Sequence, residues 1–137
     1  MLSSLGVDII EISRIRDALG RRAGLAARLF TGREREYCER RADAAPHYAA
    51  RFAAKEATAK AIGRWLRWQD VEVLNGEGGR PCLRLTGEAA ALAHIAEGGR
   101  LLVSLSHSRD YAVACVALIL PEHVRPEGSP THPGVWT

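Results

Sequence analysis

The sequence predicts a single domain in which α-helices are mixed with β-strands that pair as hairpins. Residues 51–63 read RFAAKEATAKAIG, an alanine-rich run of high helix propensity that ends at a glycine. Residues 101–106 and 111–120 are apolar runs separated by the tight turn HSRD, a pattern typical of two hairpin strands. A chain of 137 residues suits one core but is short for an enzyme that encloses a large substrate within one subunit. The length therefore also favours a site completed by a neighbouring subunit.

The composition is that of an ordinary globular protein with a mild excess of positive charge. Apolar residues make up 47% and charged residues 26%, the net charge is +3, and the isoelectric point is near 9.0. No patch interleaves arginines with aromatic residues, so we expect an acidic protein or a phosphorylated small molecule as partner and no nucleic acid. The three cysteines have no metal-ligand spacing, and neither a secretory leader nor an apolar run of membrane-spanning length is present. We therefore expect a reduced, cytoplasmic protein that does not bind membranes.

The N-terminal part is predicted to be a strand followed by a helix. Residues 1–10 have the apolar pattern of a strand, within which Asp8 is costly unless it finds a partner or a metal, although a lone aspartate at a strand end is more often a turn or cap residue. A helix capped by Ser13 is expected through Leu29. Its exposed side is rich in arginine, with Asp17 as the acidic counterweight. This side suits an acidic partner, or it is simply a solvated face.

Five further elements are expected between this helix and the last hairpin. Thr31 and Glu34 have the spacing of a capping box, and Pro46 suits the first turn of the long alanine-rich helix. Two short strands flank a glycine-rich loop and form another hairpin, and an alanine-rich helix capped by Thr86 follows. These elements are expected at residues 31–41, 46–62, 71–74, 82–85 and 86–96.

The last two strands, 101–106 and 111–120, are apolar on both faces. Both faces should therefore be covered, by helices or by another subunit. The sequence after residue 120 loses its periodicity and is rich in Pro, Gly, His and Ser. We therefore expect one domain over residues 1–120 and a flexible tail over 121–137.

Glu56 and Lys60 lie one helical turn apart and should share a face of the long helix. Among the 19 basic residues of the chain, Lys55 and Lys60 are the lysines and all others are arginines. Lysine is a compact point charge, so its use here indicates chemistry that arginine would serve less well. Taken alone, the pair also fits an ordinary ion pair on a solvated helix.

The segment SLSHS at residues 104–108 places serines beside His107, with Asp110 nearby. Neighbouring residues of a strand point to opposite faces, so Ser106 and His107 are poorly placed to form a nucleophile and base pair. A lone histidine at a strand end is usually a structural hydrogen-bonding residue. A catalytic triad is therefore not expected.

Three motifs taken together resemble the 4'-phosphopantetheinyl transferases. They are GVD at residues 6–8, RFAAKEATAK at 51–60 and SLSHS at 104–108, and their order and separations are similar to the short holo-acyl-carrier-protein synthase subfamily over residues 3–120. In the longer, pseudodimeric members a second acid follows the strand aspartate by two residues, whereas this chain has Ile10 there. That departure favours the short, oligomeric class.

The resemblance implies transfer of 4'-phosphopantetheine from coenzyme A to a serine of an apo acyl carrier protein, with release of adenosine 3',5'-bisphosphate. Asp8 and Glu56 would bind Mg2+ and, with Lys60, form the catalytic group. Arg51, Lys60, Pro81 and His107 would bind coenzyme A. Either Glu56 or a metal-bound water would accept the serine proton.

The resemblance also implies an α+β subunit with a small antiparallel sheet and packed helices, assembled as a homotrimer with the active site between subunits. Arg14 and Arg21 of the first helix would bind the acidic carrier protein. The sequence leaves open whether that carrier serves fatty acid, polyketide or another biosynthesis.

Two other classes of function would use some of the same residues. A coenzyme A or carrier-protein binding module without turnover need not keep Asp8, Glu56 and Lys60 together, and all three are present. A metal-dependent phosphohydrolase would normally need a richer cluster of carboxylates. The transferase is therefore the leading hypothesis.

Overall fold

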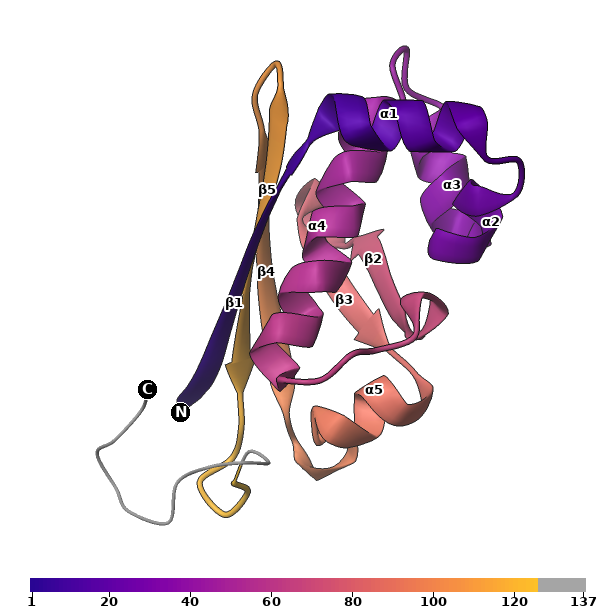
Figure 1. Cartoon of the computed structure of the whole chain (residues 1–137). Helices are drawn as coiled ribbons and strands as arrows, with labels where there is room; N and C mark the ends of the chain where they lie inside the picture. Colours follow the sequence, from indigo (N-terminus) through magenta and orange to yellow (C-terminus); the bar gives the residue numbers. More distant parts are fainter. Residues whose placement is uncertain (126–137) are drawn as a thin grey trace.

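The computed structural model describes residues 1–125 and has an α+β fold in which a long helix lies against a three-stranded sheet (Figure 1). The helices are α1 (Ile12–Arg21), α2 (Leu25–Leu29), α3 (Gly32–Glu39), α4 (Ala45–Ile62) and α5 (Gly87–Leu92). The strands are β1 (Leu2–Glu11), β2 (Val71–Asn75), β3 (Pro81–Leu85), β4 (Arg100–His107) and β5 (Tyr111–Ile119). Short 3-10 helices lie at Trp68–Asp70, Glu77–Gly79 and Ile95–Glu97.

Both sheets are antiparallel. The larger has the order β1-β5-β4, and the smaller pairs β2 with β3 across the predicted hairpin loop. In the larger sheet Asp8 lies opposite Ala114, and Ala112 lies between Ile10 and His107. The predicted α+β class, with a small antiparallel sheet and packed helices, is confirmed, as are both hairpins.

Helix α4 crosses one face of the larger sheet (Figure 1). Its alanines at 53, 57 and 61 are buried and let the sheet backbone come close. Pro46 occupies the first turn, and Gly63 ends the helix in the left-handed conformation, with φ of 87°. The predicted start and stop of this helix are confirmed to within one residue.

The first predicted helix is wrong in extent. Strand β1 runs directly into α1, so Glu11 and not Ser13 precedes the first turn. The helix ends at Arg21, and α2 begins after Gly24, whose φ is 82°. A left-handed residue cannot continue an α-helix, so the chain turns here and the predicted helix splits in two.

Of the two other predicted helix caps, at Thr31 and Thr86, the first forms and the second does not. The capping box at α3 is present, since Thr31 accepts from the Glu34 backbone and Glu34 accepts from the Thr31 backbone. Thr86 precedes α5 but makes no capping bond, and its hydroxyl lies 3.4 Å from an Asp70 carboxylate oxygen instead. Helix α5 ends at Leu92, four residues earlier than predicted, because His94 turns into the left-handed conformation with φ of 55°.

The face of the larger sheet that points away from α4 is apolar and exposed within the single chain. Its exposed side chains on two strands are Leu5 (58%), Val7 (54%), Ile9 (64%) and Leu102 (57%). The helices of this chain cover one face of the sheet, so the predicted cover of the second face is not supplied by the described residues.

The predicted tail begins at Pro121, and residues 126–137 of it lie outside the described residues. Leu120 donates a backbone hydrogen bond to Met1, and Val124 packs against the core at the end of the larger sheet. The flexible tail stays a prediction. In the part of the chain that the structure describes, no helix is both long and apolar enough to cross a bilayer.

Candidate active site

Three of the predicted site residues meet where β1 lies against α4. Lys60 Nζ donates to Asp8 Oδ1 over 3.1 Å and to the Val7 carbonyl oxygen over 3.0 Å. Asp8 therefore lies inside a strand and is neither a turn nor a cap residue. The hydrogen-bonded partner of Lys60 is this strand aspartate across the helix–strand contact, whereas Glu56, one turn away as the helical spacing predicts, interacts with Lys60 through charge alone.

Glu56 is the third member of this group. Its side chain is partly buried, and burial, followed by the negative charge of Asp8, raises the pKa of its carboxyl, while Lys60 opposes the rise. Two carboxylates and one ammonium thus share a small surface, which we call the acidic group (Asp8, Glu56 and Lys60).

The acidic group fits a hard divalent cation. Mg2+ prefers oxygen ligands and commonly binds through one or two carboxylates, with substrate phosphates and waters completing its shell. Among residues 1–125 no group of three or more His, Cys, Asp or Glu side chains could hold a metal ion, so the carboxylates available at the acidic group are Asp8 and Glu56. Burial is the main cause of the raised Glu56 pKa and repulsion by Asp8 adds to it, and a bound cation would relieve that repulsion.

Two residues predicted to bind coenzyme A, Arg51 and His107, lie in a second group beside the N-terminal half of α4. The guanidinium of Arg51 lies 4.0 Å from the centre of the Tyr37 ring and is 3.4 Å from the His47 carbonyl oxygen. The His47 ring meets the His107 ring edge to face at 5.7 Å. Arg51 is 3% exposed, and its Nε is buried without a hydrogen-bond partner. We call this set the basic group (Tyr37, His47, Arg51 and His107).

Charge at the basic group is reflected in two pKa shifts. Burial, then the positive charges of Arg51, His107 and Arg41, lower the pKa of His47. Burial alone would raise the pKa of Tyr37, but hydrogen bonds from Arg41 and Asn75 and the neighbouring arginine charges lower it. An anion placed here would meet excess positive charge.

Pro81 is the first residue of β3 in the smaller sheet, on the side of that sheet near the basic group. It pairs with Asn75, which contributes to the lowered pKa of Tyr37. Arg51 and His107 thus lie in one group, with Pro81 on the strand pair beside it, and their common ligand stays a prediction.

The acidic and basic groups are not joined within the chain. No hydrogen bond or ion pair links them among the described residues. Arg51 and Glu56 are five positions apart on α4, which places them about 140° apart around the helix. The single predicted site therefore falls on two faces of the subunit.

Arg14 and Arg21 are both exposed on α1, as predicted. A second acidic residue, which the sequence did not indicate, also neutralises part of the basic side of this helix. Arg16 forms a bidentate ion pair with Asp43, with hydrogen bonds of 2.9 and 3.0 Å. Next to Arg14 lies a groove of about 220 Å³ between α1, α2 and α4. Its lining is apolar apart from Arg14: Ile10, Ile15, Ala18, Leu19, Leu25, Leu29 and Phe52.

The groove adjoins the acidic group. Ile10 lies two residues after Asp8 on the same face of β1, and Phe52 lies one turn before Glu56 on α4. Sequence reasoning missed the groove, since it needs α2 to fold back beside α1. It also missed His47 and Tyr37, although the i,i+4 spacing of His47 and Arg51 was a usable signal.

Known proteins resemble this chain over most of its length. A holo-(acyl-carrier-protein) synthase of Desulforudis audaxviator is 46% identical over 125 residues, which are 88% of this chain and 95% of that protein. The enzyme of the same name from Syntrophotalea carbinolica is 48% identical over 120 residues, 84% of this chain and 94% of that protein.

Solved structures agree with these relatives. A holo-(acyl-carrier-protein) synthase of Bacillus anthracis in complex with CoA (3',5'-ADP) has a TM-score of 0.71 at 33% identity, covering 86% of this chain and 96% of that one. The Neisseria meningitidis protein has a TM-score of 0.75 at 28% identity, covering 88% and 100%. Residues 4–116 also match the profile of the family, and with these relatives they establish that the chain belongs to the 4'-phosphopantetheinyl transferase superfamily.

Proposed function

We propose that this protein is a holo-acyl-carrier-protein synthase, which transfers 4'-phosphopantetheine from coenzyme A to a serine of an apo acyl carrier protein. The observation that carries the proposal is the acidic group, in which two carboxylates and an ammonium from β1 and α4 meet in a member of this superfamily. The two relatives described above, which are 46% and 48% identical to this chain, are both named holo-(acyl-carrier-protein) synthase.

In the reaction the serine oxygen forms a bond to the phosphorus that carries pantetheine, and the bond from that phosphorus to adenosine 3',5'-bisphosphate breaks. Asp8 and Glu56 would hold Mg2+, which supplies positive charge to the diphosphate. Lys60, more than half exposed beside Asp8, places a point charge where it can offset charge on the transferred phosphate. Glu56 accepts the serine proton, because a carboxylate beside the transferred phosphate can act as the general base.

Coenzyme A binds through its phosphates to Arg51 and His107, with Lys60 at the transferred phosphate and Pro81 beside the adenine. The excess positive charge of the basic group supports this assignment. His47 and Tyr37 hold Arg51 and His107 in place through the ring contacts described above.

The active site is completed between subunits of a homotrimer. Two observations support this: the acidic and basic groups lie on different faces of one chain, and the sheet face bearing Leu5, Val7, Ile9 and Leu102 is apolar and exposed. A neighbour packed on that sheet face would bury it and could bring its own basic group to the acidic group. The number three rests on the family resemblance.

The carrier protein docks on α1, through Arg14 and Arg21 and the apolar groove beside them. The groove leads from these arginines to the acidic group, so a bound helix would place its serine near Glu56. No nucleic acid or membrane takes part, and the cytoplasmic location expected from the sequence stays a prediction.

The proposal is tested by incubating the full chain with coenzyme A, Mg2+ and an apo acyl carrier protein and then weighing the carrier by mass spectrometry. A gain of one phosphopantetheine group is expected. Binding of the carrier or of coenzyme A without that gain would instead indicate a binding module without turnover.

A further inference from the structure

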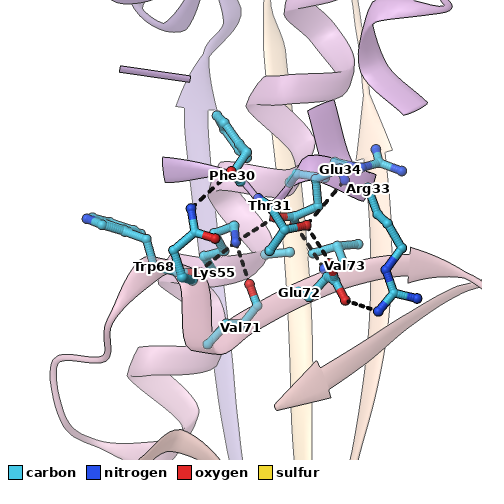
Figure 2. Close-up of polar contacts among 12 residues, drawn as sticks. Phe30, Thr31, Arg33, Glu34, Lys55, Trp68, Val71, Glu72 and Val73 are labelled. Atoms are coloured by element: carbon cyan, nitrogen blue, oxygen red, sulfur yellow. Dashed lines mark hydrogen bonds and ion pairs between the residues drawn. The ribbon is translucent and has the colours of Figure 1, made fainter. Parts of the chain in front are cut away.

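Lys55, the neighbour of Glu56 in the sequence, lies in a buried polar cluster with Glu34 and the backbone of Trp68 and Val71 (Figure 2). Its Nζ is 2.8 Å from Glu34 Oε1, and the two side chains are 1% and 0% exposed. The same ammonium donates to the carbonyl oxygen of Trp68 over 2.8 Å and to that of Val71. We call this set the Lys55 cluster, and it ties α4 to α3 and to the segment that leads into β2.

Every polar atom of the buried ion pair has a partner. The three hydrogens of the ammonium match three acceptors. Glu34 Oε1 also accepts from the Thr31 backbone N–H, and Oε2 accepts from the Val73 backbone N–H, each over 2.9 Å. Lys55 is therefore not free to contact a substrate, and its role must be exerted through the fold.

Stability alone does not explain an ion pair at this place. Removing two charges from water is costly, and a well-packed apolar pair of the same volume is often as stable as a buried ion pair or more stable. What an ion pair adds is direction, because its hydrogen bonds require a particular orientation of both side chains.

The side of α4 that faces the sheet does little to fix the rotation of the helix, so its rotation depends on contacts on the other sides, among them the Phe52–Trp68 ring stack and the Lys55 cluster. The surface toward the sheet is built from the small side chains of Ala53, Ala57 and Ala61. Such a surface allows close approach, but it has few projecting side chains to interlock with the sheet and resist rotation about the helix axis. The Lys55 cluster supplies directed contacts on another side of the same helix.

We infer that Lys55 is a positioning residue, which fixes the rotation of α4 so that Glu56 faces Asp8 on β1; this inference rests on the proposed function of the acidic group. Consecutive residues project about 100° apart around a helix, so the orientation that places Lys55 against Glu34 also sets the direction of Glu56. With a helix radius of about 5–6 Å including side chains, a rotation of about 20° would move the carboxylate by about 2 Å. Displacements of that size at reacting groups are known to reduce turnover by about a hundredfold.

The double variant Lys55→Met/Glu34→Gln tests this inference. It removes both charges together, so no buried charge is left unpaired; the glutamine oxygen can accept from one of the two backbone N–H groups that Glu34 satisfies, while the other loses its acceptor. The matched control is Thr58→Val on the same helix, because the buried Thr58 hydroxyl bonds only to the Ala54 carbonyl oxygen of α4 itself, at 2.7 Å. Each variant is measured well below its melting temperature, by transfer kinetics and by crystallography.

For the double variant we expect turnover to fall at least tenfold, with the KM for coenzyme A within twofold of the unmodified protein. Its crystal structure should show α4 rotated and Lys60 Nζ beyond hydrogen-bond distance of Asp8. Thr58→Val should change neither quantity. An unrotated α4, or a rotated α4 with normal turnover, would overturn the inference. If the unmodified protein fails to transfer phosphopantetheine, the proposed function fails, while the crystallographic comparison still judges whether Lys55 orients α4.

Discussion

Gly6 of β1 lies so close to Ala57 of α4 that a Cβ atom at position 6 would be 1.9 Å from the Ala57 carbonyl oxygen. The obstacle is backbone, so no side-chain rotation can relieve it. This contact brings β1 near enough for Asp8 to meet Lys60. The glycine of the GVD motif is therefore required by packing, two residues before the aspartate that it helps to place.

Gly6→Ala should destabilise the fold, because β1 and α4 must separate to admit a methyl group. Overpacking of this kind typically costs about 1–3 kcal/mol and can cost more. Urea unfolding followed by circular dichroism gives the change in free energy of unfolding. Gly20→Ala is the matched control: apart from the chain next to it, nothing lies within 4 Å of a Cβ at position 20, near the end of α1, where alanine should stabilise the helix by up to about 1 kcal/mol. Equal stability of the two variants would contradict the close contact.

Lys60→Arg should lose turnover by more than tenfold while the protein remains as stable as before. Arginine keeps the charge but replaces a compact ammonium with a planar group on a longer stem. Since Lys60 is more than half exposed, the larger side chain needs no repacking of the core. Steady-state kinetics and thermal melts separate the two effects, and near-normal turnover would refute the proposed role of Lys60.

Lys55→Arg should differ from Lys60→Arg in that it destabilises the fold. Lys55 is 2% exposed and its ammonium already uses all its hydrogens, so a larger guanidinium must displace its neighbours. We expect a loss of stability of about 1–3 kcal/mol. Thermal melts measure this loss. A variant that is as stable and as active as the unmodified protein would show that the Lys55 site accommodates a guanidinium without displacing its neighbours.

Reversing Arg14 and Arg21 to glutamate should slow association with the acyl carrier protein and weaken its dependence on salt. Exposed charges act chiefly on the rate of encounter, so coenzyme A binding should be unaffected. The control variant reverses Arg84 and Arg100, which are exposed on β3 and β4. Stopped-flow association at several salt concentrations makes the comparison. Equal rates for the two double variants would leave Arg14 and Arg21 as parts of a solvated face.

His47 should titrate below its ordinary pKa of 6.5 in the free protein, because burial and the charges of Arg51, His107 and Arg41 disfavour its protonation. Between that lowered value and 6.5 the unfolded chain binds a proton that the folded chain does not. The contribution of His47 to stability is therefore complete above about pH 6.5 and is lost as the pH falls toward the folded-state pKa. NMR titration of the imidazole measures this pKa, and Arg51→Gln should raise it. A titration at or above 6.5 would contradict the described surroundings of His47.

The elements that were predicted correctly are those whose signals are local. The glycine stop after α4, the capping box of Thr31 and Glu34 and the two hairpins depend on neighbouring residues. The split between α1 and α2 depends on Gly24 adopting the left-handed conformation, which the surrounding helical pattern conceals.

The candidate site was predictable in its residues and less so in its pairing. Helical spacing places Glu56 beside Lys60, but only the packing of β1 on α4 makes Asp8 the partner of Lys60. The partner of Lys55, Glu34, is 21 residues away in the sequence, and no periodicity connects them. The separation of the acidic and basic groups likewise depends on how the sheet and helix are arranged in space.

The most direct test of the account is the intact mass of an apo acyl carrier protein after incubation with coenzyme A and Mg2+ and with either the unmodified protein or its Glu56→Gln variant. Glutamine preserves the size of the side chain but can neither hold Mg2+ as a carboxylate does nor accept the serine proton. We predict that the unmodified protein adds one phosphopantetheine group to the carrier and releases an equal amount of adenosine 3',5'-bisphosphate, while the folded variant is slower by at least a hundredfold. A carrier of unchanged mass with the unmodified protein, or equal rates for the two proteins, would contradict the account.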